Sequence, residues 1–376
     1  MWMANAQKQS ALEMTLPITL ILPTRNAMGA IEEHLRAIAD VLPRVAQIVV
    51  VDSSEDGTLD YLRSRIDLPT AEFHARPRGL YESWNFGVRQ ATAEFIYFST
   101  IGDTITLAGL EHLLEVAVRH AADMTISPPE MFDDKGEPLP DRRWPIHDLC
   151  AETGADTDHV LTPAAAFIWS TSYVPSTVLG SSASNLYRRS FLLDRPFIEN
   201  WGHCADSPWM MANCLAGTIA VTSRSVARFV IHAKEPVAAG GHVIGMSHYE
   251  DMYRRAHEGL AASGLTAQEK AALGGWLYAM ARRDKLFLER IENYAGYLAR
   301  RDEKIAALEE RVVKARRRAA EFEVQLKQSS QKIVDLRRTI GQYERAHRSL
   351  SAMIALYCSV KLDQLKKLWT LIREKS

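Results

Sequence analysis

Short apolar runs alternate with helical patterns through roughly the first 130 residues, and this alternation constrains the fold more than any other feature of the chain. The runs at 17–23 (PITLILP) and 47–52 (QIVVVD) are almost wholly apolar, which is typical of strands buried on both faces of a sheet. Such strands with helices between them predict the α/β class, with a doubly wound, mostly parallel sheet covered by helices on both faces. The other predicted strands are 71–75, 94–100 and 124–127, and the predicted helices are 31–42, 58–62, 80–91 and 107–120.

The regular pattern weakens between residues 128 and 180, where seven prolines occur. We expect this segment to be irregular and to act as a binding loop or a lid, because long loops in compact domains usually serve such roles. Regular patterns return at 181–235, with a polar turn (SSASN), a helix-like patch and the strand-like runs AGTIAVTS and ARFVIH.

A heptad repeat begins at Ile291 and continues to Leu350. Its eighteen seam positions alternate in steps of three and four, and fifteen of them are apolar or Ala. A repeat of this length predicts a coiled coil, and hence self-association or a helical partner. The alternative is a long single helix in solvent. The mixed residue types at the seam favour no particular number of strands.

The last segment, 351–376, is predicted to be a basic amphipathic helix. Two interpretations of it stay open. The helix lies on an anionic membrane surface with Trp369 at the headgroup level, or it packs against the enzyme body or within an oligomer.

The net charge of −1 hides two parts of opposite sign. Residues 1–280 hold 22 Lys and Arg against 33 Asp and Glu, whereas residues 281–376 hold 23 against 13. Such asymmetry indicates modules with different partners. The basic residues lie on the predicted coiled coil without interleaved aromatic residues or a reading motif, which argues against nucleic acid as a partner.

The N-terminal residues lack the apolar core of a signal peptide. No apolar run approaches the ~18 residues that span a bilayer. The four cysteines are far apart, which is typical of free thiols in a reducing compartment and not of a zinc site. We therefore expect a soluble cytoplasmic protein, peripheral on the inner face of the plasma membrane if its last helix binds lipid.

Polar residues follow three predicted strands at their carboxyl ends, where open α/β sheets bind ligands. Asp52 follows the second strand and can accept hydrogen bonds from a ribose hydroxyl or a base. Asp103 follows the fourth strand, and its hard oxygen ligands suit Mg²⁺ or Mn²⁺. Asp56 is interpreted as a helix cap. The first strand is followed by Pro23, Thr24, Arg25 and Asn26. Three polar strand ends at one edge predict a nucleotide site.

The segments ITLILPTRN, IVVVDSSEDGT and PRGLYESWNFGVRQATAEFIYFSTIGDT carry a more specific signal. The third follows the pattern P-x-x-G-[IL]-Y-[DE]-x-x-N-x-G and leads into a strand that ends in an acidic motif. Together they resemble the nucleotide-sugar half of family 2 glycosyltransferases with the GT-A fold, and the resemblance covers roughly residues 16–235. The positions on the pattern are Pro77, Gly79, Leu80, Tyr81, Glu82, Asn85 and Gly87.

The resemblance implies roles for residues in this half. Asp52 resembles the carboxylate that binds the nucleoside, and Asp103 resembles the last Asp of a metal-binding D-x-D motif. The stretch that ends at Asp103 begins with Ser99, so the earlier acidic residue of that motif is missing. The implied nucleotide-sugar site contains Pro23, Thr24, Arg25, Asn26, Asp52, Arg78, Gly79, Tyr81, Asn85 and Gly102.

The later stretch NLYRRSFLLDRPFIENWGHCADSPWMM is similar to the acceptor half of the family. The match implies that Asp206 is the general base that deprotonates the acceptor hydroxyl; the alternative is a plain helix N-cap. Trp201 and Trp209 are expected to line the acceptor pocket. His232 falls where some members place an additional metal ligand, and the alternative is a structural histidine.

We therefore expect an inverting, metal-dependent glycosyltransferase that uses a nucleotide-diphospho sugar and Mg²⁺ or Mn²⁺. The implied acceptor is a glycan or a lipid-linked molecule in bacterial surface polysaccharide synthesis. The alternative is a catalytically weak scaffold that recruits partners through its coiled coil. A nucleotidyltransferase is disfavoured because no Gly-rich phosphate loop with a Lys follows the first strand.

The expected organisation has five parts. They are a flexible N-terminus at 1–15, a glycosyltransferase domain at 16–245 (nucleotide-sugar half 16–127, acceptor half 128–245), a helical connector at 246–286, a coiled coil at 287–350 and the basic amphipathic helix at 351–376.

Overall fold

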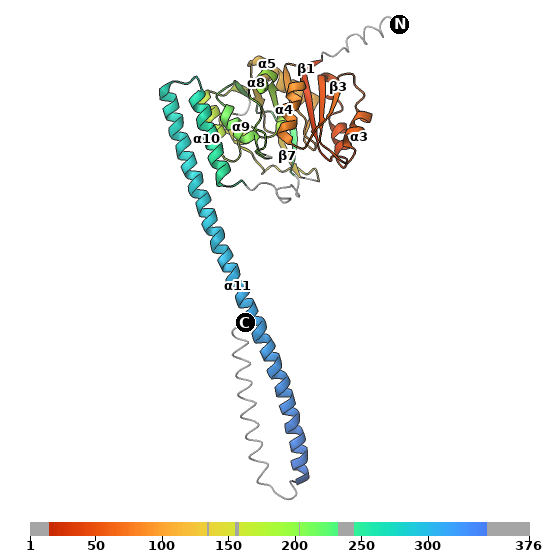
Figure 1. The fold of residues 1–376 in the computed structure, drawn as a ribbon, viewed down its shortest axis with the longest axis vertical. Helices are drawn as coiled ribbons and strands as arrows, with labels where there is room; N and C mark the ends of the chain where they lie inside the picture. Colours follow the sequence, from red (N-terminus) through yellow and green to blue (C-terminus); the bar gives the residue numbers. More distant parts are fainter. Residues whose placement is uncertain (1–14, 134, 155–157, 203, 232–243, 344–376) are drawn as a thin grey trace. The chain divides into compact units, whose positions relative to one another are not determined.

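The computed structural model describes residues 15–133, 135–154, 158–202, 204–231 and 244–343. The chain divides into two compact units after Phe287. The first unit contains two sheets and their covering helices, and the described part of the second is the continuation of one long helix (Figure 1).

Eight strands form the main sheet in the order β3-β2-β1-β4-β9-β6-β10-β8. The strands from β3 to β4 run parallel, as do β6 and β10, whereas β9 lies antiparallel between β4 and β6 and β8 is antiparallel at one edge. The predicted α/β class with a mostly parallel sheet is confirmed. The strands are β1 Leu16–Thr24, β2 Val45–Asp52, β3 Ala71–Ala75, β4 Phe95–Phe98, β6 Met124–Ile126, β8 His159–Val160, β9 Asn185–Arg188 and β10 Ile219–Val221.

Successive residues of the central strands enter two separate hydrophobic cores, one on each face of the sheet. Ile21 and Val49 belong to the first core, whereas their neighbours Leu20 and Ile48 belong to the second. Each core therefore buries apolar surface, which stabilises the fold by about 25 cal/mol per Å² of area removed from water. The second core is covered by α2 (Ile31–Ala37), α3 (Thr58–Arg65) and α5 (Leu107–Arg119), and the first by α4 (Leu80–Gln90), α8 (Arg189–Asp194), α9 (Asp206–Asn213) and the helices described next.

The prediction that residues 128–180 are irregular is wrong. Two helices occur there, α6 (Pro145–Thr153) and α7 (Pro163–Thr171), and both have Pro within their first two positions. Proline is favourable at a helix start because the first N–H groups have no acceptor within the helix. The segment also supplies β7 (Glu130–Asp133) to a second sheet of order β5-β11-β7, with β5 at Thr104–Ile105 and β11 at Ala227–Ile231.

Residues 246–286 pack into the first core. Helix α10 (Met246–Ala262) buries Met252 and Leu260, and the start of α11 (Ala267–Tyr343) buries Leu273 and Leu277. Helices α9 and α10 approach closely, because a Cβ added at Gly259 would lie 2.2 Å from the Ala212 carbonyl oxygen. These two helical segments therefore belong to the first unit, which ends at Phe287.

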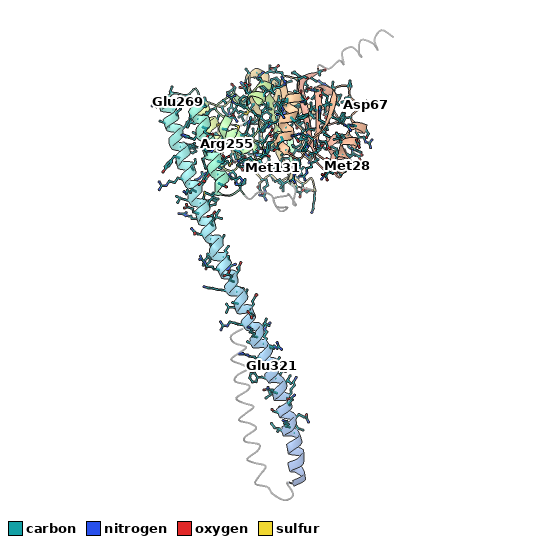
Figure 2. The ribbon with its side chains drawn as sticks, viewed as in Figure 1. Met28, Asp67, Met131, Arg255, Glu269 and Glu321 are labelled. Carbon is teal, nitrogen blue, oxygen red and sulfur yellow. The ribbon has the colours of Figure 1, made fainter. Side chains whose placement is uncertain are left out.

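Helix α11 continues unbroken through the described part of the second unit (Figures 1 and 2). The seam side chains Ile291, Tyr294, Ile305, Leu308 and Phe322 are 43% to 64% exposed in the single chain. The helix is thus present, and the coiled coil stays a prediction. The segment 351–376 lies outside the described residues. Among the helices of the described ranges, none has the length and apolar character that a membrane span requires.

Candidate active site

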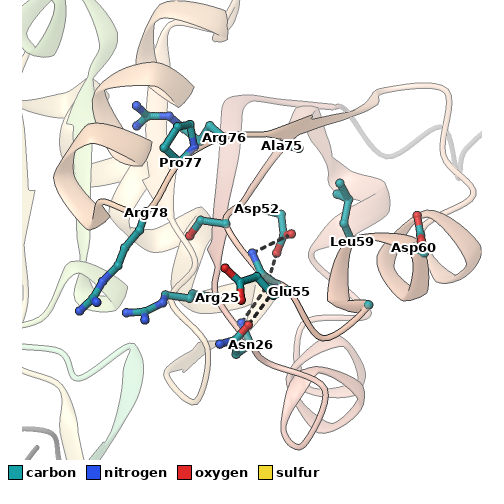
Figure 3. Close-up of a pocket in the computed structure, with 13 residues that line it drawn as sticks. Arg25, Asn26, Asp52, Glu55, Leu59, Asp60, Ala75, Arg76, Pro77 and Arg78 are labelled. Atoms are coloured by element: carbon teal, nitrogen blue, oxygen red, sulfur yellow. Dashed lines mark hydrogen bonds between the residues drawn. The ribbon is translucent and has the colours of Figure 1, made fainter.

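A pocket of about 470 Å³ opens beside the carboxyl ends of β1, β2 and β3 (Figure 3). Because these strands are parallel, the residues that follow them meet at one edge of the sheet. The pocket combines acidic, basic and hydroxyl side chains, which suits a polar ligand with an anionic part. Its lining residues are Arg25, Asn26, Asp52, Ser53, Ser54, Glu55, Gly57, Leu59, Asp60, Ala75, Arg76, Pro77 and Arg78.

The carboxylate of Asp52 is held in one orientation at the back of this pocket. Its Oδ1 accepts hydrogen bonds from the hydroxyls of Thr24 at 2.5 Å and Ser54 at 2.6 Å, and its Oδ2 accepts one from the backbone N–H of Ser54 at 3.1 Å. Thr24 is itself buried, so it supports Asp52 and does not line the pocket. A carboxylate fixed in this way can accept a ligand hydrogen bond without losing side-chain freedom.

The loops after β1 and β2 are joined across the mouth of the pocket. Asn26 donates its backbone N–H to the Ser54 hydroxyl at 2.7 Å and accepts the Glu55 N–H at 3.0 Å. Asp56 accepts the backbone N–H and the hydroxyl of Thr58, and these bonds, led by the hydroxyl, lower the pKa of Asp56. From the sequence, Asp56 is interpreted as a helix cap; in the structure the cap position of α3 is occupied by Gly57, and Asp56 instead bonds to Thr58, the first residue of the helix.

Two guanidinium groups converge on the pocket from different strand ends. Arg25 follows β1 and Arg78 precedes α4, and their side chains point to the same side of the pocket in Figure 3. Both are exposed, and within the described ranges no ion pair is seen for either. Paired guanidiniums bind phosphate oxygens well because their N–H donors match the geometry of phosphate.

A second hollow, of about 450 Å³, adjoins the first and shares Arg25 and Asn26 with it. Pro23 lines this hollow together with Leu80, Thr100 and Ile101. The predicted donor residues Pro23, Arg25, Asn26, Asp52 and Arg78 therefore line two adjoining hollows.

Two predicted glycines contribute through their backbone. Gly79 has φ +156° just before α4, and a Cβ there would lie 2.4 Å from Oε2 of Glu82. Gly102 has φ +96° in the turn that leads to Asp103. L-residues rarely adopt such angles, so both positions require glycine for the shape of the loop.

Asp103 lies next to the second sheet. Its Oδ2 accepts the Thr100 hydroxyl at 2.9 Å, and its Oδ1 accepts the N–H of Val230 in β11 at 3.2 Å. The end of β11 therefore lies beside Asp103. His232, which directly follows that strand in sequence, lies outside the described residues. Within the described residues, no three His, Cys, Asp or Glu side chains are grouped as a metal site would require.

Asp206 is the first residue of α9, and its Oδ1 accepts the N–H of Ser207 at 3.0 Å. It therefore lies in the first helical turn, with Ala205 in the cap position, where the helix dipole stabilises a negative charge. Burial, followed by the negative charge of nearby Asp206, raises the pKa of the Tyr81 hydroxyl well above its usual value of 10. Tyr81 is 4% exposed and does not line either hollow, contrary to the expectation that it binds the donor.

Asn85 is also a residue of the interior. Its side chain accepts the Phe197 N–H at 2.9 Å and donates to the Phe197 carbonyl at 2.9 Å and to Oε1 of Glu199 at 3.0 Å. It is buried and fastens α4 to the segment before α9. The placement of Asn85 thus does not support direct contact with the donor.

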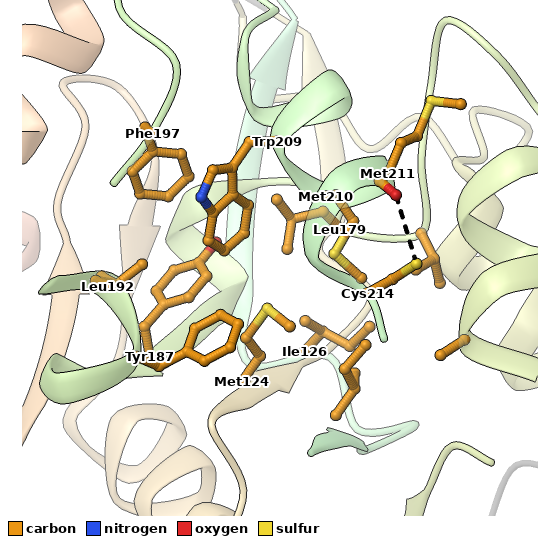
Figure 4. Close-up of a cluster of buried hydrophobic side chains, with 14 of the residues drawn as sticks. Met124, Ile126, Leu179, Tyr187, Leu192, Phe197, Trp209, Met210, Met211 and Cys214 are labelled. Carbon is orange, nitrogen blue, oxygen red and sulfur yellow. Dashed lines mark hydrogen bonds between the residues drawn. The ribbon is translucent and has the colours of Figure 1, made fainter. Parts of the chain in front are cut away.

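The two tryptophans expected in the acceptor pocket have different surroundings. Trp209 has no exposed surface, and its indole N–H donates to the Arg195 carbonyl at 2.9 Å, so it belongs to the core (Figure 4). It packs on Phe197 with ring centroids 4.4 Å apart. Trp201 is half-buried and donates its N–H to Asp251 of α10 at 2.9 Å. Of these two tryptophans, only Trp201 has exposed surface.

Sequence reasoning missed several pocket residues, including Ser54, Glu55 and Arg76. Ser54 and Glu55 follow Asp52 by two and three positions, so their place in the same loop was the available signal. Arg76 follows β3 directly, and the rule that strand ends carry ligand contacts would have selected it.

The fold is GT-A-like, with a mostly parallel mixed sheet. Residues 19–173 match the model of Glycosyl transferase family 2. This part of the chain is a glycosyl transferase family 2 domain, and the family is an inverting one.

Solved structures agree on the fold. S. aureus TarS 1–349 in complex with UDP-GlcNAc is 20% identical, with a TM-score of 0.54, over 69% of this chain and 70% of that one. The same fragment in complex with UDP gives a TM-score of 0.50 at 20% identity over 69% of each chain. A longer S. aureus TarS chain is matched over 43% of its length and 70% of this chain, with a TM-score of 0.51 at 19% identity. Curated protein sequences yield no match.

Proposed function

We propose that the protein transfers a sugar, with inversion, from a nucleotide-diphospho sugar to a glycan or lipid-linked acceptor in bacterial surface polysaccharide synthesis. The observation that carries the proposal is the pocket at the strand ends, where the oriented carboxylate of Asp52 lies near two free-standing guanidiniums. The UDP-GlcNAc bound to S. aureus TarS supports a uridine diphosphate sugar as the first donor to test.

Different residues of this chain bind different parts of the donor. Asp52 accepts hydrogen bonds from the nucleoside, as the resemblance to the family implies. Arg25 and Arg78 donate to the diphosphate, whose negative charge increases as the bond to the sugar breaks. Positive groups placed where charge develops stabilise the transition state more than the bound substrate.

GT-A glycosyltransferases typically use a divalent cation through a D-x-D motif. Asp103 offers one hard carboxylate beside the turn of residues 99–103, which fits Mg²⁺ or Mn²⁺ when diphosphate and water complete the octahedron. His232 is the second proposed ligand. A bound cation would add charge stabilisation at the leaving diphosphate.

Asp206 acts on the acceptor. Its carboxylate takes the proton of the acceptor hydroxyl as that oxygen attacks the anomeric carbon from the face opposite the leaving group, which inverts the configuration. Trp201, the half-buried tryptophan before α9, is the proposed surface for the acceptor. Aromatic faces suit sugars because they combine apolar area with a polar edge.

The test is calorimetric binding of UDP, GDP, dTDP and CMP, with and without Mn²⁺. We expect one nucleotide to bind, Asp52→Asn to weaken it about tenfold or more because a charged hydrogen bond is lost, and Asp103→Asn to remove the Mn²⁺ dependence. Asp67→Asn is the matched control, since Asp67 is exposed and outside both hollows. A folded wild-type protein that binds none of the four would refute the proposal and favour the scaffold.

We further propose that α11 joins two or more copies of the chain through its heptad seam. The exposed apolar side chains of that seam support a second copy as the partner, because burying them is the driving force of coiled-coil assembly. Joined catalytic units would then contact the inner face of the plasma membrane together, which raises avidity. Leu308→Glu should reduce the mass in sedimentation to that of a monomer, whereas Val313→Glu, exposed but off the seam, should not. If the mass of Leu308→Glu is unchanged, the heptad seam does not join the copies of the chain.

A further inference from the structure

Charged side chains flank the apolar seam of α11 on both sides. The heptad step from Ile291 to Tyr294 is three residues and the next step is four, so Ile291 occupies position a and Tyr294 position d. Positions g and e are then the two flanks of the seam. Between residues 300 and 325, the charged residues at g are Lys304, Arg311 and Arg318, which we call the basic flank, and those at e are Asp302, Glu309, Arg316 and Glu323.

The charges on the outer face of α11 have partners within the helix, whereas those of the basic flank do not. On the outer face, Lys314 lies 2.7 Å from Oε1 of Glu310, and Arg317 lies 3.5 Å from Oε1 of Glu321. Within the described part of the chain, no ion pair is seen for the three residues of the basic flank or for Glu309, and all of them are exposed. The flanks of the seam therefore hold charges that a second helix can pair.

The two flanks complement each other when two copies of α11 lie parallel and in register. In that arrangement, a g residue of one copy faces the next e residue of the other copy. Two of the three charged contacts made by the basic flank are then attractive and one is repulsive, and the symmetry of the pair makes each contact twice. The attractive contacts join Lys304 to Glu309 and Arg318 to Glu323, and the repulsive one joins Arg311 to Arg316.

An antiparallel pair would place like charges together. In that arrangement g faces g and e faces e, so every charged contact of the basic flank would join two basic residues, whatever the register. The e flank would gain little in return, because it holds residues of both signs. Charge complementarity therefore favours the parallel arrangement.

Positions a and d of the seam also differ from each other. From residue 291 to 333, four of the seven a residues are β-branched, whereas none of the d residues is. The four are Ile291, Ile305, Val312 and Ile333. Side chains of this kind at position a are typical of parallel coiled coils with two strands. The seam as a whole is mixed, but its a positions favour a pair.

We propose that α11 binds a second copy of itself in a parallel, in-register pair whose direction is set by the basic flank facing Glu309 and Glu323 of the other copy. The inference rests on the proposed function, of which self-association through α11 is a part, and adds the number and direction of the helices. Both glycosyltransferase units are then attached at the same end of the pair, whereas an antiparallel pair would attach them at opposite ends of a stretch of about 80 Å. Two active sites at one end can contact the same polymeric acceptor.

The first experiment places single cysteines at two d positions of the full chain, Tyr294→Cys and Phe322→Cys, with Cys204 and Cys358 changed to Ser. Identical residues meet across a parallel in-register pair, so both variants should form disulfide-linked dimers on oxidation. An antiparallel pair can link at most one of them, because cysteines with Cα atoms more than about 7 Å apart cannot be bridged. Ala320→Cys, exposed at position b on the outer face, is the control and should form no linked dimer.

The second experiment measures the dissociation constant of the pair by sedimentation equilibrium. Lys304→Glu should weaken the pair about tenfold, because its contact with Glu309 becomes repulsive in both copies, and adding Glu309→Lys should restore the affinity. Arg300→Glu makes the same change of charge at an exposed residue of the outer face. It is the matched control and should leave the constant within about twofold of the wild type.

Three results would overturn the inference. Linked dimers from only one of the two d-position variants, or an affinity that Lys304→Glu leaves unchanged or strengthens, would exclude the parallel direction. A wild-type mass of three or more copies would exclude the pair. A monomeric wild type would refute the self-association in the proposed function as well, whereas donor binding by the first unit is decided separately by the calorimetric test.

Discussion

Replacing Asn85 with Ala separates a structural role for this residue from a role in donor binding. The side chain satisfies both the N–H and the carbonyl of Phe197, a residue that is 2% exposed. Alanine leaves these two buried groups without their partner, and each such loss costs about 1–3 kcal/mol. The third bond, to Glu199, adds little because that side chain is exposed. We expect the free energy of unfolding to fall by about 2–4 kcal/mol.

Urea unfolding measures this change, with the slope m unchanged if both states keep their compactness. Asn213→Ala is the control, since its side chain makes a single bond to the Trp209 carbonyl one helical turn back, and about 0.5 kcal/mol is expected for it. Nucleotide affinity of the folded Asn85→Ala protein should stay within about twofold of the wild type. Unchanged stability with a tenfold weaker nucleotide would refute the reasoning and make Asn85 a donor ligand.

Two further perturbations act on stability. Burial lowers the pKa of His34 from 6.5 to about 4. The neutral side chain therefore contributes about 3 kcal/mol to the free energy of unfolding, fully present above pH 6.5 and lost as the pH falls toward 4. Over this pH range the urea midpoint of the wild type should fall more steeply than that of His34→Gln. Gly259→Ala should destabilise by about 1–3 kcal/mol because its Cβ meets the Ala212 carbonyl, whereas Gly275→Ala, with no atom within 4 Å, should stabilise the helix by up to about 1 kcal/mol.

Parallel pH profiles for wild type and His34→Gln would show that His34 titrates normally in the folded protein. Equal effects of Ala at the two glycines would show that α9 and α10 do not approach each other as described.

Local patterns of sequence located most elements of the donor half. The extended run predicted at 71–75 coincides with β3, and the helix predicted at 80–91 differs from α4 by one residue. Buried parallel strands need continuous apolar residues and covering helices need an apolar stripe, so the signals are strong and local. The edge of the sheet that holds the pocket was predicted by the same reasoning.

The roles of Tyr81 and Asn85 depend on contacts with residues more than a hundred positions away. One signal was nevertheless present, because Tyr81, Trp84, Asn85 and Val88 follow the spacing i, i+3, i+4, i+7 of a buried helical stripe. A polar residue on such a stripe is more often a buried partner than a ligand contact. Strand β9 had no comparable signal, since four residues such as Asn185–Arg188 acquire their antiparallel neighbours only in the folded sheet.

The position of β9 has a consequence for biosynthesis. It joins the parallel group that ends at β4 to the pair formed by β6 and β10, so a nascent chain that stops before residue 185 leaves the outer edges of β4 and β6 open. Unpaired edges are templates for pairing with other chains. The segment matched by the family, residues 19–173, ends before β9 and should aggregate when expressed alone. During translation, the nucleotide half thus stays unfinished until the strand that leads to Asp206 has left the ribosome.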